Sequence, residues 1–225
     1  MNHLLSKIGS YPFEKLNLLH KDIKPSKEVI NLSIGEPKLN ADSKVLDILN
    51  KETNSFSNYP PMNAVPELSE AYRQYLKNHF GIENVAEDEV CLVAGTREGT
   101  FSIIQALFNK ENVKEKPFVV MPNPFYQIYG GATTLAGGEA KFLDCPEEDN
   151  FQPDLDSLKS EDWQKCQILV LCSPNNPTGS VLPLSKLKNI LDLAEKYDFY
   201  VVSDECYVDL YLSLIHISEP TRPTP

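Results

Sequence analysis

The chain has 225 residues and a formal net charge of −11, from 32 acidic and 21 basic side chains. Because the acidic residues are scattered along the chain, this charge disfavours nucleic acid or an anionic membrane as the main partner. No apolar run has the length of a membrane span, and the first residues lack a signal-peptide pattern. The cysteines show no CxxC spacing and the histidines show no metal-ligand spacing. We therefore expect a cytoplasmic protein with reduced cysteines and no metal site.

The N-terminal part of the chain is predicted to contain short elements. Residues 11–16 are expected to form a short helix, because proline suits a first turn. A short strand is predicted over 29–34, and it leads into Gly35-Glu36-Pro37. Asp42 has a side chain suited to cap the next helix, which we expect to run to about Asn54.

A longer amphipathic helix is predicted over 66–80. Gly81 is suited to end it, because glycine readily adopts the backbone conformation found after helices. The apolar residues of this segment recur at helical spacing: Leu68, Ala71, Tyr72, Tyr75 and Leu76.

A strand over 89–93 is predicted to lead into the turn Ala94-Gly95-Thr96-Arg97-Glu98-Gly99. The helix that follows, over 101–109, is apolar on most sides, so we expect it to be buried. A Gly-Thr turn at the start of a helix presents free backbone N–H groups and the positive end of the helix dipole. The turn is therefore a candidate phosphate site, to which Thr96 adds a hydroxyl donor, although small turns at helix starts are common.

The next strand is predicted over 117–121, and Pro122-Asn123-Pro124-Phe125-Tyr126 follows it. Tyr126 places an aromatic side chain just after this strand, whereas Phe125 is expected to pack in the core. A short strand is predicted over 140–144, after a pair of glycines. The acidic segment 145–163 is expected to form a surface connection with one helical turn.

The last predicted strand-helix-strand unit carries the most specific motifs. An apolar strand over 167–171 leads into the loop Cys172-Ser173-Pro174-Asn175-Asn176-Pro177-Thr178-Gly179. A helix over 184–197 and a strand over 199–203 follow. That strand ends in Asp204-Glu205-Cys206-Tyr207.

Strands that alternate with helices predict an α/β fold with a mostly parallel sheet. We expect the helices to pack on this sheet, and the strands over 90–93 and 199–203 to share it. Ligands of parallel sheets bind where the strands end, so the four motifs that follow strands are expected to surround one concave site. Ordinary turns use the same residue types, so it is the order of the motifs along the chain that favours a site. The four motifs are 95–98, 124–126, 173–179 and 204–207.

In this order the motifs resemble those of the pyridoxal-phosphate (PLP) aminotransferases of fold type I, over roughly residues 11–211. Within that family the pattern is most similar to succinyldiaminopimelate aminotransferase of lysine biosynthesis. The residues that carry this similarity are Gly95-Thr96-Arg97-Glu98, Asn123-Pro124-Phe125-Tyr126-Gln127-Ile128-Tyr129, Leu135-Ala136-Gly137-Gly138 and Ser203-Asp204-Glu205-Cys206-Tyr207.

The resemblance implies transamination between an amino acid and 2-oxoglutarate or glutamate, with PLP as cofactor. It places Asp204 beside the ring nitrogen, where a carboxylate favours the protonated ring that acts as an electron sink. Glu205 is expected to be a solvated acid. The resemblance also implies that the ring's phenolic oxygen accepts hydrogen bonds from Asn176 and Tyr207. The phosphate is expected to be bound by Gly95, Thr96 and Arg97, and the face of the ring to be covered by Tyr126.

Two further roles follow from the same resemblance. Tyr59 is expected to reach the cofactor phosphate of the partner subunit in a homodimer. Gly35 is expected to help hold the substrate carboxylate through its backbone. Two positions depart from the family pattern, because Ala64 and Ser69 stand where the family usually has Gly and Arg.

The family's Schiff-base lysine lies beyond the Asp-x-x-Tyr strand, yet no lysine follows Lys196. The family's substrate-binding arginine is also expected beyond this chain. Residues 212–225 resemble a translated sequencing adapter. We therefore expect an N-terminal fragment without its own transaminase activity: an arm and part of a small domain over 1–40, a truncated PLP-binding large domain over 41–211, and a non-native tail.

Three other functions were weighed. A nucleotide or dinucleotide enzyme predicts a Gly-x-Gly-x-x-Gly turn after an early strand, which the sequence lacks. A non-catalytic binding protein with the cofactor fold agrees with the missing lysine. Another fold type I activity, such as a carbon–sulfur lyase, agrees with the same motifs.

Overall fold

The computed structural model describes residues 2–9, 11–30, 32, 35, 40–57, 59, 66–111 and 116–210. The contacts divide the chain into two compact units. The larger unit comprises Met1–Gly9 with Arg73–Pro225, and the smaller comprises Ser10–Tyr72.

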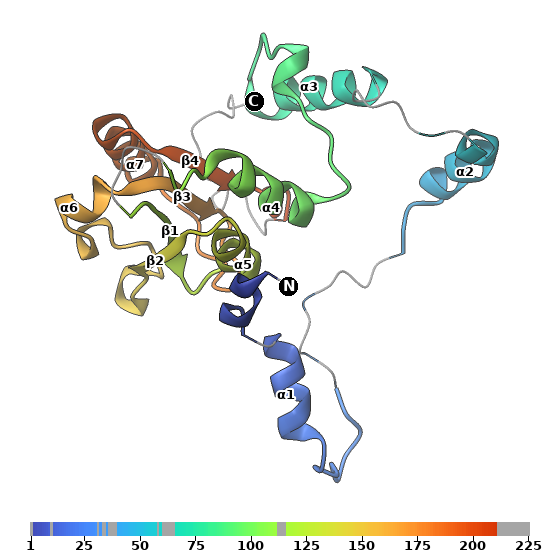
Figure 1. Cartoon of the computed structure of the whole chain (residues 1–225). Coiled ribbons are helices and arrows are strands. Elements are labelled where there is room, and N and C mark those ends of the chain that lie inside the picture. Colours follow the sequence, from blue (N-terminus) through green and yellow to red (C-terminus); the bar gives the residue numbers. More distant parts are fainter. Residues whose placement is uncertain are drawn as a thin grey trace. The chain divides into compact units, whose positions relative to one another are not determined.

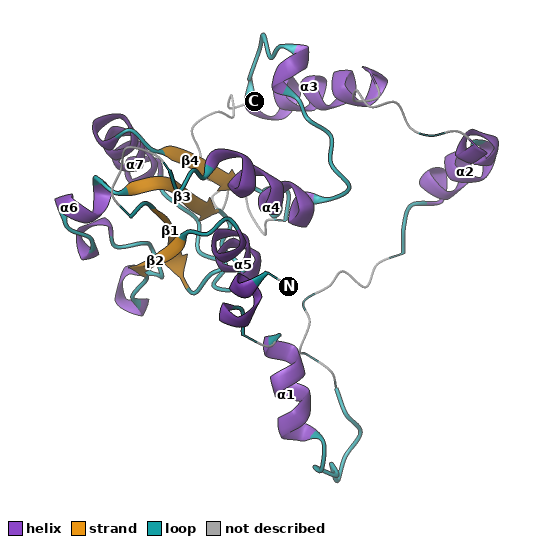
Figure 2. Cartoon of the chain, viewed as in Figure 1, coloured by secondary structure: helices purple, strands orange, loops and turns teal. Residues whose placement is uncertain are grey.

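The larger unit is built on a four-stranded, fully parallel sheet with the spatial order β2-β1-β3-β4 (Figures 1 and 2). The two middle strands are almost entirely buried, as expected when helices cover both faces of a parallel sheet. The predicted α/β fold is therefore confirmed. The strands are β1 (Phe118–Asn123), β2 (Glu139–Asp144), β3 (Cys166–Cys172) and β4 (Tyr200–Asp204).

One face of the sheet is covered by α4 (Thr96–Leu107) and α5 (Gln127–Leu135). The other face is covered by α6 (Ser160–Trp163) and α7 (Leu184–Tyr197), as Figure 1 shows. The alternating side chains of the middle strands divide between the two cores. Val119, Met121, Ile168 and Val170 pack with α4 and α5, while Phe118, Val120, Leu169 and Leu171 pack toward α6 and α7.

Four expectations about the larger unit need correction. The predicted strand over 89–93 is absent: Glu87–Glu89 is a 3-10 turn and 90–93 has no strand assignment. A strand forms only beside a partner, and among the described residues none pairs with this segment. The helix α4 is not buried all round, because only Thr100 and Ile104 are buried and Ile103 is 39% exposed.

The other two corrections concern connections. The helix α5 was not predicted, because two glycines and two threonines give its segment a poor helix composition. The segment 145–163 is more than a surface connection: it contains two 3-10 turns and α6, and it buries Leu158 and Trp163. The Trp163 ring stacks on the Phe199 ring at a centroid distance of 5.6 Å, so this segment packs against the start of β4.

The smaller unit contains α1 (Pro12–His20), α2 (Ser43–Lys51) and the start of α3 (Pro66–Phe80). Asp42 caps α2 as predicted, accepting a hydrogen bond from the Lys44 N–H at 2.8 Å. No strand is assigned at Val29 and Ile30, and the rest of the predicted strand lies almost wholly outside the described residues. The apolar face of α2 is exposed: Val45 by 59%, Leu46 by 48%, Ile48 by 62% and Leu49 by 50%.

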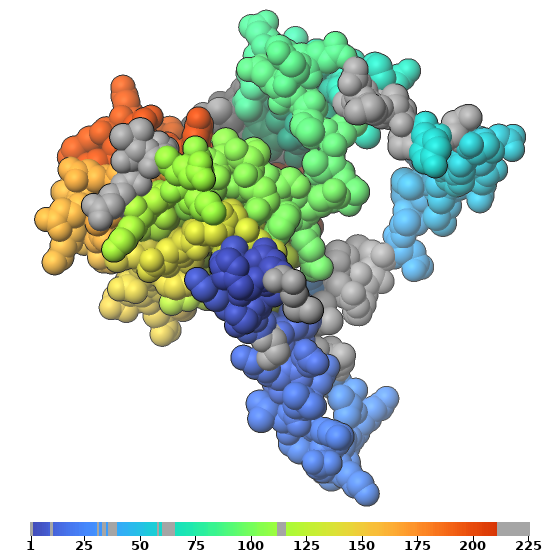
Figure 3. Space-filling view, viewed as in Figure 1, coloured from blue at the N-terminus to red at the C-terminus, as the bar shows by residue number. Residues whose placement is uncertain are grey.

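The helix α3 begins and ends as predicted, and Tyr75 in its second half donates a hydrogen bond to Asp209, beyond β4, at 2.7 Å. Near the other end of the chain, the 3-10 turn His3–Lys7 packs against α5, dark blue against yellow in Figure 3. None of the helices within the described ranges combines the length and apolar character that crossing a bilayer requires. The predicted tail over 212–225 lies outside the described residues.

Candidate cofactor site

The Asp204 carboxylate is held in place at the end of β4. Its Oδ2 accepts a hydrogen bond from the Tyr129 hydroxyl at 2.7 Å, and its Oδ1 accepts one from the Cys206 N–H at 3.2 Å. Each carboxylate oxygen has two lone pairs, so both oxygens retain capacity for a further donor. Glu205 is exposed and accepts a hydrogen bond from the Ser203 hydroxyl, which agrees with the solvated role expected for it.

Tyr129 lies on α5 and is completely buried. Burial raises the pKa of its hydroxyl far above the ordinary value, and the hydrogen bond to Asp204 raises this pKa further. The hydroxyl therefore remains a donor to the carboxylate throughout the working pH range. Next to it, burial raises the pKa of the Cys172 thiol to about 11, so this thiol stays protonated and unreactive.

The turn before α4 keeps the features of an anion site. Gly95 is the N-terminal cap with φ 133°, a conformation that side chains disfavour, and no side chain caps the helix. The N–H groups of Thr96 and Arg97 in the first turn have no partner within the helix. The Cys206 thiol donates to the Thr96 hydroxyl oxygen at 3.0 Å, which joins this turn to the segment after β4.

Two further contacts bring the predicted residues together. Arg97 Nε donates a hydrogen bond to the Tyr126 hydroxyl at 2.9 Å. The Tyr126 ring then meets the Tyr129 ring edge to face, with centroids 5.7 Å apart. The phosphate turn, the aromatic residue and the Asp204 carboxylate are thus linked by direct contacts between neighbouring side chains.

The loop after β3 joins the same group through Asn176, whose Nδ2 donates a long hydrogen bond of 3.5 Å to the Tyr207 hydroxyl. Burial raises the pKa of Tyr207, with Cys206 beside it adding to the shift, so its hydroxyl also stays a donor. The loop is fixed from outside the site by Gln152, whose Nε2 donates to the Ser180 hydroxyl at 2.8 Å and to the Val181 carbonyl at 2.9 Å.

The structure therefore brings together seven of the predicted site residues in the larger unit: Gly95, Thr96, Arg97, Tyr126, Asn176, Asp204 and Tyr207. The other two, Gly35 and Tyr59, belong to the smaller unit, where Tyr59 is 99% exposed. Their roles remain predictions.

Sequence reasoning missed Tyr129, Cys206 and Gln152 as parts of this site. A signal for Tyr129 was present, because Tyr129, Ala132, Thr133 and Ala136 stand at i, i+3, i+4 and i+7, the spacing of a buried helix face. Gln152 gave no signal, because a glutamine in an acidic connection is usually solvated.

Known proteins are similar to this chain in sequence and in fold. A family model described as "Aminotransferase class I and II" matches residues 27–220. The chain belongs to the class I and II aminotransferases. An aspartate aminotransferase from Pyrococcus horikoshii is 30% identical over 86% of the chain and 48% of its own length. An LL-diaminopimelate aminotransferase from Natranaerobius thermophilus is 26% identical over 92% of the chain and 53% of its own length.

Solved aminotransferase structures agree with this assignment. An aminotransferase from Neisseria meningitidis Z2491 is 40% identical and superposes with a TM-score of 0.87, over 95% of the chain and 55% of that protein. The aminotransferase AspB from Helicobacter pylori 26695 is 35% identical, with a TM-score of 0.83 over 91% of the chain and 53% of that protein. The chain spans about half the length of the relatives that it matches.

Class I and II aminotransferases depend on PLP, and the donor set present here fits that cofactor. A phosphate group is favoured at a helix start, and the first turn of α4 has no side-chain cap hydrogen bond. A protonated pyridine nitrogen needs a fixed anionic acceptor, which Asp204 provides. The two features lie within one connected set of side chains, joined through Thr96 and Cys206.

Proposed function

We propose that the intact protein is a PLP-dependent transaminase that exchanges an amino group between an amino acid and 2-oxoglutarate. We further propose that its amino-acid substrate is N-succinyl-LL-diaminopimelate, in lysine biosynthesis. The observation that carries the transaminase assignment is the Asp204 carboxylate, fixed by Tyr129 and by a backbone N–H beside a helix start suited to phosphate.

When bound, PLP supplies an electron sink for the bonds around the substrate's α-carbon. The residues of this chain bind and orient it. Asp204 would accept a hydrogen bond from the ring N–H, and its negative charge would favour the protonated form of that nitrogen. The N–H groups of Thr96 and Arg97 donate to the phosphate.

Two side chains complete the proposed ring site. Asn176 and Tyr207 donate hydrogen bonds to the phenolic oxygen of the ring, and the Tyr207 hydroxyl keeps its proton because burial raises its pKa. Tyr126 covers one face of the ring, which limits contact of the ring with water.

Two groups of relatives bear on the substrate. The LL-diaminopimelate aminotransferases, among them those of Natranaerobius thermophilus and Syntrophobacter fumaroxidans, support a diaminopimelate skeleton. The aspartate aminotransferases of two Pyrococcus species, at 30% and 32% identity, favour aspartate as a second candidate. These substrates differ in size, so the ratio of their kcat/KM values shows which of them the enzyme prefers.

The test is a donor series with the intact gene product, PLP and 2-oxoglutarate. Glutamate formation is measured with N-succinyl-LL-diaminopimelate, LL-diaminopimelate and aspartate, and the values of kcat/KM are compared. We expect the succinylated donor to have the highest value. A higher value for aspartate would overturn the substrate assignment, and the absence of turnover with every amino donor would overturn the transaminase assignment.

We also propose that the intact protein is a homodimer in which Tyr59 reaches the partner's cofactor phosphate. The exposed apolar face of α2 supports this proposal, because such faces are usually covered in the working assembly. Light scattering of the intact protein measures its mass, and a monomer at micromolar concentration would contradict the proposal. Tyr59→Phe is expected to weaken cofactor binding without changing that mass.

A further inference from the structure

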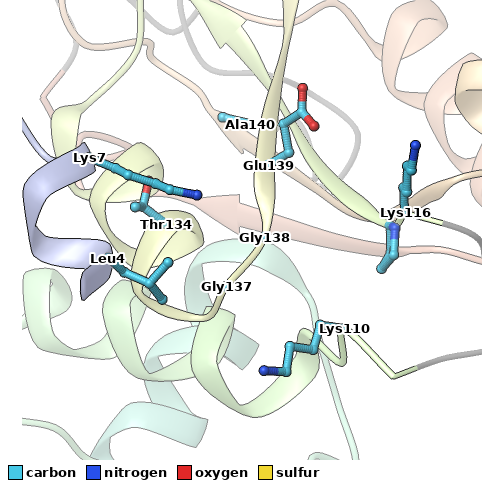
Figure 4. A pocket seen from close by; sticks show the side chains of 10 residues that line it. Leu4, Lys7, Lys110, Lys116, Thr134, Gly137, Gly138, Glu139 and Ala140 are labelled. Atoms are coloured by element: carbon cyan, nitrogen blue, oxygen red, sulfur yellow. The ribbon is translucent and has the colours of Figure 1, made fainter. Parts of the chain in front are cut away.

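A hollow lies at the opposite end of the sheet from the cofactor motifs. It has a volume of about 610 Å³ and is lined by residues where β1 and β2 begin, at Pro117 and Glu139 (Figure 4). The cofactor motifs lie at the carboxyl ends of the strands, so a ligand in this hollow would leave the cofactor site open.

Three lysines from three separate segments line the hollow. Lys7 comes from the N-terminal 3-10 turn, Lys110 follows α4, and Lys116 precedes β1. Figure 4 shows Lys7 and Lys110 near the turn Gly137–Gly138 and Lys116 farther from it, with the Lys116 ammonium group directed away from the turn and the three ammonium groups apart from one another. This grouping is notable in a chain whose net charge is −11.

The described part of the chain pairs none of these lysines with a carboxylate. Among the described residues, none of the three ammonium groups forms a salt bridge, and Glu139 is the one acidic side chain in the lining. In Figure 4 the Glu139 carboxylate points away from the Gly137–Gly138 turn. Thr134 adds a hydroxyl to the lining, although that hydroxyl already donates to the Gly130 carbonyl at 2.9 Å.

The lining also has a fixed floor. The N–H groups of Gly137 and Gly138 bond to the carbonyls of Thr134 and Thr133 at 3.0 and 2.9 Å. A side chain at position 138 would meet the Phe108 ring at 2.7 Å, so only glycine fits there. Because Gly137 and Gly138 have no side chains, the hollow beside them is bordered by the flexible lysine side chains.

We propose that this hollow binds a small organic or inorganic polyanion that carries at least two carboxylate or phosphate groups. Two groups are favoured because the three lysines come from separate segments and their ammonium groups lie apart from one another in Figure 4. A compact anion is favoured over an extended polymer, because the negative charge of the rest of the chain repels long polyanions.

The probes are inorganic pyrophosphate and citrate, titrated calorimetrically into the full chain at low ionic strength, with inorganic phosphate as the single-group control. We expect pyrophosphate or citrate to bind more tightly than phosphate, and the affinity to fall as salt is added, since salt screens exposed charges. Preference for pyrophosphate over citrate identifies a phosphate ligand, and the reverse identifies a carboxylate ligand.

The triple variant K7Q/K110Q/K116Q tests the location. Three exposed ion pairs together predict a loss of about 10-fold in affinity. The matched control K24Q/K44Q/K188Q removes the same charge from exposed lysines elsewhere and is expected to retain the affinity. The variant Thr96→Ala perturbs the other anion site and is also expected to leave this binding unchanged.

Three results would overturn the proposal: no binding of either polyanion at low salt, equal losses in the two triple variants, or loss in Thr96→Ala alone. Circular dichroism of each variant checks that it folds like the parent chain. Because the test measures anion binding at the far end of the sheet, it is independent of the transaminase assignment.

Discussion

Replacing Tyr129 by phenylalanine isolates the hydrogen bond that holds Asp204. The ring stays in the core, where Tyr129 is fully buried against Tyr126 and its neighbours, and only the hydroxyl is lost. The lost bond is short, at 2.7 Å, and it ends on a carboxylate. Hydrogen bonds to charged groups contribute about 1.5–3 kcal/mol. Because Asp204 is only half-buried and water replaces part of the loss, we expect destabilisation of about 1.5 kcal/mol.

The assay is urea unfolding of the full chain at pH 7, followed by circular dichroism. The matched control is Tyr200→Phe on β4, where the side chain is 59% exposed, and its effect is expected within about 0.5 kcal/mol of zero. In the double variant with Asp204→Asn the two losses should not add, because the residues share one hydrogen bond. Equal effects of Tyr129→Phe and Tyr200→Phe would refute the reasoning.

Three further predictions follow from the site. In the intact protein, Thr96→Val should weaken PLP binding by about 10-fold, the value of one hydrogen bond to a charged group, while pyridoxal, which lacks the phosphate, keeps its affinity. Fluorescence titration measures the affinity for each ligand, and equal losses of affinity for PLP and pyridoxal would show that the turn does not bind the phosphate. The free energy of unfolding should fall as pH rises from about 9 toward 11, by at most about 1.4 kcal/mol per pH unit for the Cys172 thiol, because this thiol loses its proton at a lower pH in the unfolded chain than in the folded one. The Cys172→Ala variant should show a flatter dependence on pH, and an unchanged slope would argue against a raised pKa of Cys172. The 225-residue chain should form no glutamate from any amino donor with PLP and 2-oxoglutarate, because no lysine follows Lys196; turnover lost in Asp204→Ala would show that an earlier lysine serves.

The sequence predicted most of the sheet, because its buried strands are continuous apolar runs bounded by turn residues. Cys166–Cys172 and the helix Leu184–Tyr197 illustrate this, and both lie where the pattern put them. The segment 90–93 has the same apolar character, yet it is not a strand, since strand formation depends on a neighbour that local sequence does not reveal.

Tyr126 and Asp204 were proposed because they lie at strand ends, which a parallel sheet gathers at one edge, and the structure has strands there, β1 and β4. Thr96 was proposed on the same ground, but the segment before it is not a strand, and the Cys206 thiol joins it to the end of β4. The residues that hold them were harder to find. Tyr129 acts from the middle of a helix with poor helix propensity, and Gln152 acts from a connection. Their roles depend on contacts between segments 75 and 28 residues apart in sequence.

We propose that Asp204 keeps the cofactor's ring nitrogen protonated. This proposal is tested by the ¹⁵N chemical shift of ¹⁵N-labelled PLP bound to the intact protein, recorded across a pH series. We expect the ring nitrogen to stay protonated well above the pH at which it titrates in free PLP. In Asp204→Asn, which keeps the shape and loses the charge, the nitrogen should be unprotonated at neutral pH. The same protonation state in both proteins would show that Asp204 does not control the protonation of the ring nitrogen.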